Sequence, residues 1–120
     1  MNNNKLKYKI YSIESKVTKI IDGDTIQVNM YVFPNLIYEN IRVRLEGINA
    51  EELKSKSERA YKAKQALEAL LLNKNVIVEF NGVQSFNRYI GKVYLESDVD
   101  ELDVGKYLLD NKLVDVYIKS

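Results

Sequence analysis

The stretch IIDGDTIQVNMYVFPNLIYENIRVRLEGINAEE, residues 20–52, carries the clearest pattern in the chain. Apolar and polar residues alternate from Thr25 to Phe33, which indicates a strand buried on one face. The preceding Asp22-Gly23 is typical of a turn in which glycine supplies a positive φ. A second alternating run, 41–48, ends through Gly47. The stretch therefore predicts two neighbouring strands whose ends carry carboxylates and arginines.

The rest of the chain supplies three further strands and two helices. Alternating apolar residues indicate the strands. Ser55 and Glu58 form a capping box ahead of an apolar stripe, and Asp103 is expected to cap a second, short helix. The expected strands are 12–21, 25–33, 41–48, 76–80 and 89–95, and the expected helices are 55–72 and 104–111. Segment 36–40 is expected to be a loop or the end of a hairpin, the other expected loops or turns are 81–82, 86–88 and 97–101, and residues 1–7 are expected to be disordered.

The order of these elements indicates the fold class. Three strands before the first helix argue against an alternating Rossmann-type sheet. Five short strands with a helix between the third and the fourth are the layout of an OB barrel. The 120 residues are therefore expected to form one β-rich α+β domain over 1–120, a five-stranded OB-fold barrel with one main helix and a short C-terminal helix.

The composition limits the chemistry. The chain has no cysteine and no histidine, so thiolate chemistry and the commonest general base and zinc ligand are excluded. Catalysis would have to use carboxylates, lysine, tyrosine or arginine, and a metal would have to be a hard, oxygen-bound ion. The net charge of +1 is low for a protein that coats a duplex, but it suits one that holds one or two phosphates locally.

The sequence carries no targeting signal that we recognise. No apolar run approaches the roughly 20 residues that span a bilayer, and the first residues contain no apolar signal-peptide core. We expect a monomer without membrane contact. It would be cytoplasmic, or secreted if a leader was removed.

The oxygen-bearing residues of the opening stretch are candidate metal ligands. Ca²⁺ takes six to eight oxygens from carboxylates, amides, carbonyls and water. Asp24, the side chain of Asn49 and a carbonyl near Ala50 would supply about half of such a shell. Asp22 and Asp24 are equally typical of a turn with no ligand, because aspartate is common in turns.

The arginines are candidate phosphate ligands. Arg42 and Arg44 share one face of the strand 41–48, and Arg88 precedes the last strand. An arginine fork matches two phosphate oxygens, although each of these residues taken alone fits a solvated surface charge. The basic run 54–64 is interpreted as the solvated face of a helix.

Together these motifs resemble the staphylococcal nuclease family. The similar segments are IDGDTI at 21–26, VRLEGINAEEL at 43–53, the Ala/Leu-rich helix, and NRYIGKVY at 87–94, and the resemblance extends from about 17 to 117. It implies an OB-fold barrel with a Ca²⁺-dependent phosphodiesterase site for DNA and RNA, with single-stranded substrate preferred.

The resemblance also implies a role for each matching position. Asp24 matches the first Ca²⁺ carboxylate, Asn49 stands where the family usually has a second aspartate, and Ala50 matches a ligand that acts through its backbone carbonyl. Glu52 matches the general base, and Arg44 and Arg88 match the phosphate-binding arginines. Two departures are notable: Asn49 removes one negative charge, and Glu51 replaces a proline.

Two alternatives to a nuclease remain open. The first is an OB-fold module that binds single-stranded nucleic acid or a protein without cutting, because this fold often serves in binding. The second is an interaction or inhibitor protein with a vestigial site that binds neither nucleotide nor metal. The intact carboxylate and arginine positions favour the active enzyme.

Overall fold

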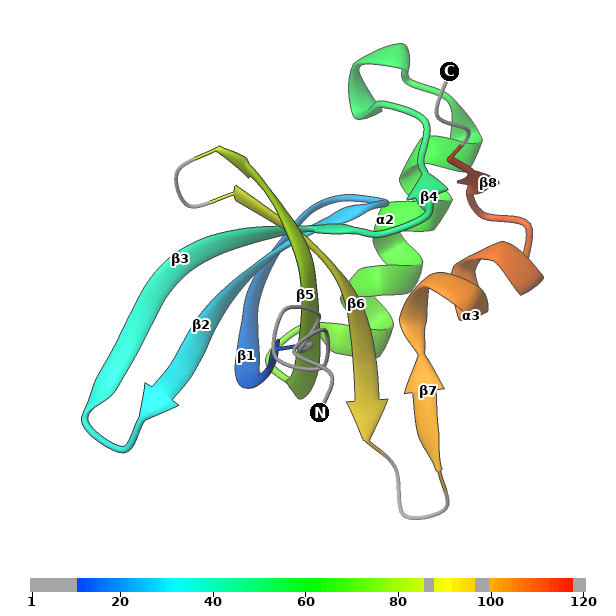
Figure 1. Ribbon diagram of the computed structural model, residues 1–120. Coiled ribbons are helices and arrows are strands. Elements are labelled where there is room, and N and C mark those ends of the chain that lie inside the picture. The colour runs from blue at the N-terminus through cyan, green and yellow to red at the C-terminus, as the bar shows by residue number, and fades with distance from the viewer. Residues whose placement is uncertain (1–10, 86–87, 97–99, 118–120) are drawn as a thin grey trace, which may run out of the picture.

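The structure, a computed structural model, describes residues 11–85, 88–96 and 100–117 (Figure 1). Its strands are β1 (Tyr11–Asp22), β2 (Thr25–Phe33), β3 (Leu36–Leu45), β4 (Ile48–Asn49), β5 (Asn75–Ser85), β6 (Arg88–Glu96), β7 (Glu101–Asp103) and β8 (Asp115–Val116), and its helices are the 3₁₀ turn η1 (Leu53–Ser55), α2 (Glu58–Leu71) and α3 (Val104–Asp110). The predicted disorder at 1–7, and residues 86–87 and 97–99 of the predicted loops, lie outside the described residues.

The strands form a closed barrel. Their order is β3-β2-β1-β5-β6-β7, and a parallel pairing of β3 with β6 joins the two sides. The predicted five-stranded OB-type barrel is confirmed, with α2 after β3 and the short α3 near the C-terminal end. In Figure 1 both helices lie in the right half of the molecule, and the β2–β3 hairpin extends away from them to the lower left.

The core is formed by apolar residues at alternate positions of the strands and by apolar residues three or four positions apart on α2. In β2 the buried residues Ile26, Val28 and Met30 alternate with more exposed ones. In α2 the buried positions are Ala60, Ala63, Leu67 and Leu71, as the predicted stripe requires. The small alanines of the first turns let α2 approach the barrel closely at the β1–β2 turn.

Gly23 is required in that turn because its surroundings leave no space for a side chain. The expectation that it supplies a positive φ is wrong, because Gly47, with φ of 80°, is the glycine in the left-handed region among the described residues. A Cβ on Gly23 would lie 2.6 Å from the Cβ of Ala63 and 2.9 Å from that of Ala50. The turn that carries the candidate carboxylates is therefore packed directly against α2.

We expect Gly23→Ala to lower the free energy of unfolding by about 1–3 kcal/mol, because the added methyl group overpacks this contact. Urea denaturation measures the change. Gly82→Ala is the matched control, since a Cβ there would first meet Ile90 at 3.7 Å, an ordinary contact, and its expected effect is under about 0.5 kcal/mol. Equal losses in the two variants would contradict the packing argument.

Three predicted element boundaries are wrong. Segment 36–40, expected to be a loop or the end of a hairpin, is strand at the end of the β2–β3 hairpin, because a tight Pro34-Asn35 turn lets β3 pair with β2 from Leu36 onward. The turn expected at 81–82 is absent, because β5 continues through a register shift between Phe80 and Gly82 and stays paired with β6. The strand expected over 41–48 ends at Leu45, since the backbone turns at Gly47.

The predicted capping box is also wrong. Residues 53–55 form a 3₁₀ turn that ends at Lys56 with a φ of 57°, so α2 begins later than expected. Ser57 is the N-cap, and its Oγ accepts a hydrogen bond of 3.0 Å from the Ala60 N–H. Glu58 pairs with Lys62 on the helix surface. The predicted cap of α3 is confirmed, because the Asp103 side chain accepts a hydrogen bond from the Lys106 N–H.

No helix within the described ranges is both long enough and apolar enough to cross a membrane.

Candidate functional site

The β1–β2 turn holds two aspartates in different environments. Asp24 is 4% exposed, and its Oδ1 accepts a hydrogen bond of 2.9 Å from the Thr25 hydroxyl. Its Oδ2 accepts a hydrogen bond of 2.9 Å from the Ala50 N–H. Asp22 closes the turn, since its Oδ1 accepts a hydrogen bond of 3.1 Å from the Asp24 N–H. The two aspartates therefore shape a turn, and Asp24 also ties this turn to the segment after β4.

The two carboxyl groups have opposite pKa shifts. Burial, followed by the interaction with Asp24, raises the pKa of Asp22 from 3.8 to about 6. Burial also acts to raise the pKa of Asp24, but the Asp22 side chain, the Ala50 N–H and the Arg44 charge together lower it on balance. Asp24 is thus the carboxylate that these surroundings keep ionised.

Arg44 brings the candidate residues together. Its Nη1 lies 2.8 Å from Oδ2 of Asp24, and its Nη2 donates to Oδ1 of Asn49 at 3.1 Å and to the Ile48 carbonyl at 3.3 Å. Its guanidinium carbon lies 5.8 Å from the centre of the Tyr117 ring, within the range of a cation–π contact. Asp24, Asn49 and Arg44, which are up to 25 positions apart in the sequence, therefore form one connected group.

A cleft of about 300 Å³ lies beside this group. Three arginines contribute to its lining, and Arg42 and Arg88 occupy the same register position of the parallel β3–β6 pair. The full lining is Ile21, Asp22, Thr25, Arg42, Arg44, Arg88 and Tyr89. Because β3 and β6 are far apart in the sequence, only the closure of the barrel brings the arginines to one cleft, where they can hold an anion such as a phosphate.

Glu52 lies outside this cleft. Its side chain is 68% exposed, and its carboxylate lies 3.1 Å from Nζ of Lys54. Ala50 is nearly buried and contributes its N–H to Asp24. The structure thus groups Asp24, Asn49, Ala50, Arg44 and Arg88 near the cleft and leaves Glu52 on the adjoining loop.

Glu51 faces the start of α2. The hydroxyl of Ser57 donates to its carboxylate, and Arg59 lies 3.9 Å from the same group. The Glu51 carboxylate is therefore engaged at the start of α2.

Arg59 also holds the C-terminal segment, a role that its sequence position within the basic run 54–64 does not indicate. Its two Nη groups donate to the Asp115 carboxylate at 2.9 and 3.0 Å, and its Nε donates to the Lys112 carbonyl at 3.1 Å. Asp115 pairs with Asn49 in the two-stranded β4–β8 sheet, which leads to Tyr117 beside Arg44. No local pattern could reveal a contact that spans 56 positions.

The donor chemistry fits a hard cation. Asp24 offers a carboxylate, Asn49 an amide oxygen and Ala50 a backbone carbonyl oxygen. All are the oxygen ligands that Ca²⁺ prefers. Clusters of three or more histidine, cysteine, aspartate or glutamate residues do not occur in the described part of the chain, so the donor set is low in charge.

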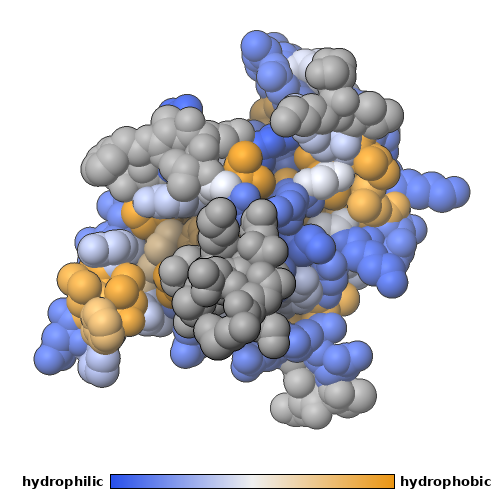
Figure 2. All heavy atoms as spheres, in the orientation of Figure 1, coloured by the Kyte–Doolittle hydropathy of each residue, from blue (hydrophilic) through white to orange (hydrophobic). Residues whose placement is uncertain are grey.

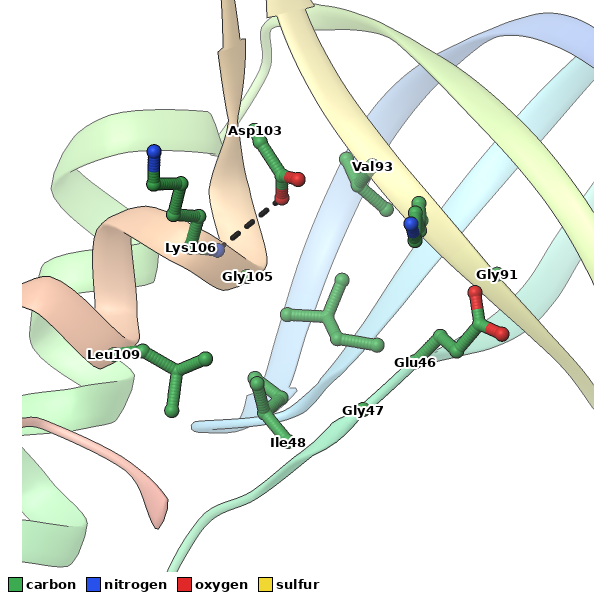
Figure 3. A pocket seen from close by; sticks show the side chains of 11 residues that line it. Glu46, Gly47, Ile48, Gly91, Val93, Asp103, Gly105, Lys106 and Leu109 are labelled. Carbon is green, nitrogen blue, oxygen red and sulfur yellow. Dashed lines mark hydrogen bonds between the residues drawn. The ribbon is translucent and has the colours of Figure 1, made fainter. Parts of the chain in front are cut away.

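A second, smaller hollow of about 170 Å³ lies between the β3–β4 turn, β6 and α3 (Figure 3). Glu46, Asp103 and Lys106 are at its rim, and the Asp103 carboxylate accepts the backbone hydrogen bond of the helix cap there. Its walls are largely apolar, and none of the predicted site residues lines it.

Comparison with known proteins gives one family. The model described as staphylococcal nuclease homologue matches residues 42–118, a span that contains Arg44, Asn49, Glu52 and Arg88. A search of curated proteins found no match to the chain.

Proposed function

The chain belongs to the staphylococcal nuclease homologue family, and on this premise we propose that it is a calcium-dependent nuclease that hydrolyses DNA or RNA. Members of the family are typically nucleases, and their domains bind nucleic acids. The observation that carries the proposal is the ion pair of Arg44 with Asp24 at the edge of a cleft that Arg42 and Arg88 also line.

The arginines would bind the scissile phosphate. Asp24 and Asn49 hold the Arg44 fork in place before substrate arrives, so little reorganisation is needed when charge develops on the phosphate. Arg88 faces the same cleft from β6. The two guanidinium groups would neutralise the additional negative charge as phosphorus becomes five-coordinate.

Glu52 would act as the general base and take a proton from the attacking water. Because its side chain lies outside the cleft, this role requires loop 50–57 to bring the carboxylate toward the arginines. Asp24, Asn49 and the Ala50 carbonyl would hold Ca²⁺, which when bound withdraws charge from a phosphate oxygen. We further propose that one chain acts alone on single-stranded or frayed substrate, because the cleft has to surround one phosphate.

The test is the degradation of heat-denatured DNA in Ca²⁺ and in EDTA. We expect the wild type to cut only in Ca²⁺. We expect Glu52→Gln, purified identically, to be at least about a hundredfold slower, the lower end for a general base, because the carboxylate is exposed. Activity that survives EDTA, or equal activity in the two proteins, would point to a contaminating nuclease or a different base.

A binding module without catalysis is the second candidate, favoured by the exposed position of Glu52 and by the neutral Asn49. It predicts binding of denatured DNA with no cleavage in Ca²⁺. A protein with a vestigial site would show neither cleavage nor a shift in melting temperature with Ca²⁺ and a nucleoside bisphosphate.

We expect Asn49→Asp to lower the calcium concentration for half-maximal activity about tenfold, because it adds a negative charge to a ligand set that is low in charge. Calcium titrations of activity and of heat release measure the shift. Asn35→Asp, in the exposed β2–β3 turn, adds the same charge away from the cleft and should leave the titration unchanged. If the two variants gave the same titration curve, Asn49 would not be a ligand.

A further inference from the structure

The outer face of the β2–β3 hairpin changes character along its length. Buried and more exposed positions alternate in β2, so Thr25, Gln27, Asn29 and Tyr31 share the face directed away from the core, and a register shift between Tyr31 and Phe33 interrupts this alternation at the end of the strand. Thr25 lines the arginine cleft at one end of the strand. Tyr31 and Phe33 lie at the other end, where they are 36% and 66% exposed.

The partner strand repeats this gradient. The β2–β3 register places Arg44 opposite Thr25 and Arg42 opposite Gln27. It then places Ile37 opposite Tyr31, and beyond a register shift it places Leu36 opposite Phe33 at the tip of the hairpin, so the apolar side chains of this end lie on both faces of the tip. We call this apolar end, formed by Tyr31, Phe33, Leu36 and Ile37, the hairpin platform. Figure 2 shows apolar side chains gathered over this part of the molecule, at the left.

Lysines connect the cleft to the hairpin platform. In the β1–β2 register Lys19 lies opposite Gln27 and Lys16 lies opposite Asn29, on the same outer face, and both are exposed. The acidic residues beside this path are Glu39 of β3 and Glu14, which is exposed on β1 two positions beyond Lys16. A chain of phosphates that leaves the cleft along this face would therefore meet positive charge before it reaches the aromatic rings.

We propose that the hairpin platform is a stacking surface for the bases of single-stranded nucleic acid whose phosphate lies in the arginine cleft. This inference rests on the proposed function. Continuity of the platform with the cleft and the lysines between them favour this occupant over a second copy of the chain. Aromatic rings beside a basic track bind single strands with little dependence on base sequence, because every base has a face that can stack.

The geometry sets a length requirement. Tyr31 lies six positions beyond Thr25, the β2 residue that lines the cleft, which is roughly 20 Å along a strand. At about 3.4 Å for each stacked nucleotide this is roughly six nucleotides, and fewer if the bound strand is extended. A dinucleotide in the cleft cannot reach the hairpin platform, whereas a twelve-nucleotide strand can.

The test compares binding of fluorescently labelled dT12 and dT2 in EDTA, where cleavage does not interfere. We expect Tyr31→Ala/Phe33→Ala to bind dT12 at least about tenfold more weakly and dT2 as the wild type does. Tyr61→Ala is the matched control, because this α2 tyrosine is 48% exposed and lies outside the hairpin. Equal dT12 affinity in the wild type and the double variant would overturn the inference.

A second readout does not depend on removing side chains. The chain has no tryptophan, so Phe33→Trp places a single indole on the hairpin platform. We expect dT12 to quench its fluorescence and dT2 to leave it unchanged, whereas Tyr61→Trp should respond to neither. Lack of quenching at position 33 would overturn the inference.

Sedimentation of the wild type and the double variant tests whether a second copy of the chain covers the hairpin platform instead. If Tyr31→Ala/Phe33→Ala converted a dimer to a monomer while dT12 affinity stayed the same, the surface would be a contact between two copies and the inference would be wrong. Because binding is measured without cleavage, a chain that binds dT12 through the hairpin platform but does not cut would contradict only the proposed function.

Discussion

Replacing Arg44 with lysine is expected to lower kcat/KM for denatured DNA by about 10²–10³-fold, the loss that follows from removing one preorganised donor. The guanidinium reaches Asp24 with one Nη group and Asn49 with the other, and the same side chain lines the phosphate cleft. Lysine keeps the charge beside the buried Asp24 carboxylate, so the fold should survive. It cannot reproduce the fork that orients two donors at once.

The matched control for this variant is Arg42→Lys, two positions away on the same face of β3. Arg42 lines the same cleft but has no ion pair within the described residues, so its loss should mainly raise KM. Arg44→Lys should instead lower kcat. Similar changes in kcat and KM for the two variants would mean that Arg44 contributes only general positive charge.

Much of the barrel was predictable because its signals are local. The alternation in β2 depends on neighbouring residues, and so do the stripe of α2 and the Asp103 cap, and all three were confirmed. One error came where tertiary pairing overrides a local signal. Gly82 is typical of a turn, yet β6 lies close enough to keep β5 paired beyond it.

The sequence predicted which residues belong to the candidate site, but it did not predict how they contact one another. Sequence similarity indicated Asp24, Asn49 and Arg44. Their mutual contacts form because the β1–β2 turn packs between α2 and the segment around Ala50. Arg88 joins Arg42 and Arg44 at the cleft because β6 pairs in parallel with β3, which no local pattern encodes. Tyr117 reaches Arg44 because Arg59 holds Asp115, a link between distant parts of the chain.

Replacing Asp24 with asparagine should have the largest effect in the molecule. The substitution keeps the size of the side chain and an oxygen for the Ala50 N–H, but it removes the charge that holds Arg44. We expect kcat/KM to fall on the order of 10³-fold or more, because both the orientation of Arg44 and the proposed cation ligand are lost. The stabilisation by Ca²⁺ with a nucleoside bisphosphate, measured as a shift in Tm, should disappear.

Asp22→Asn separates these effects from damage to the turn. It lies in the same turn and keeps an oxygen for the Asp24 N–H, but Asp22 has no ion pair among the described residues. Its activity should therefore fall much less than that of Asp24→Asn. If both variants lost activity equally while urea denaturation showed Asp24→Asn as stable as the wild type, the pair would act as one ligand unit. The central role assigned to the contact between Asp24 and Arg44 would then be wrong.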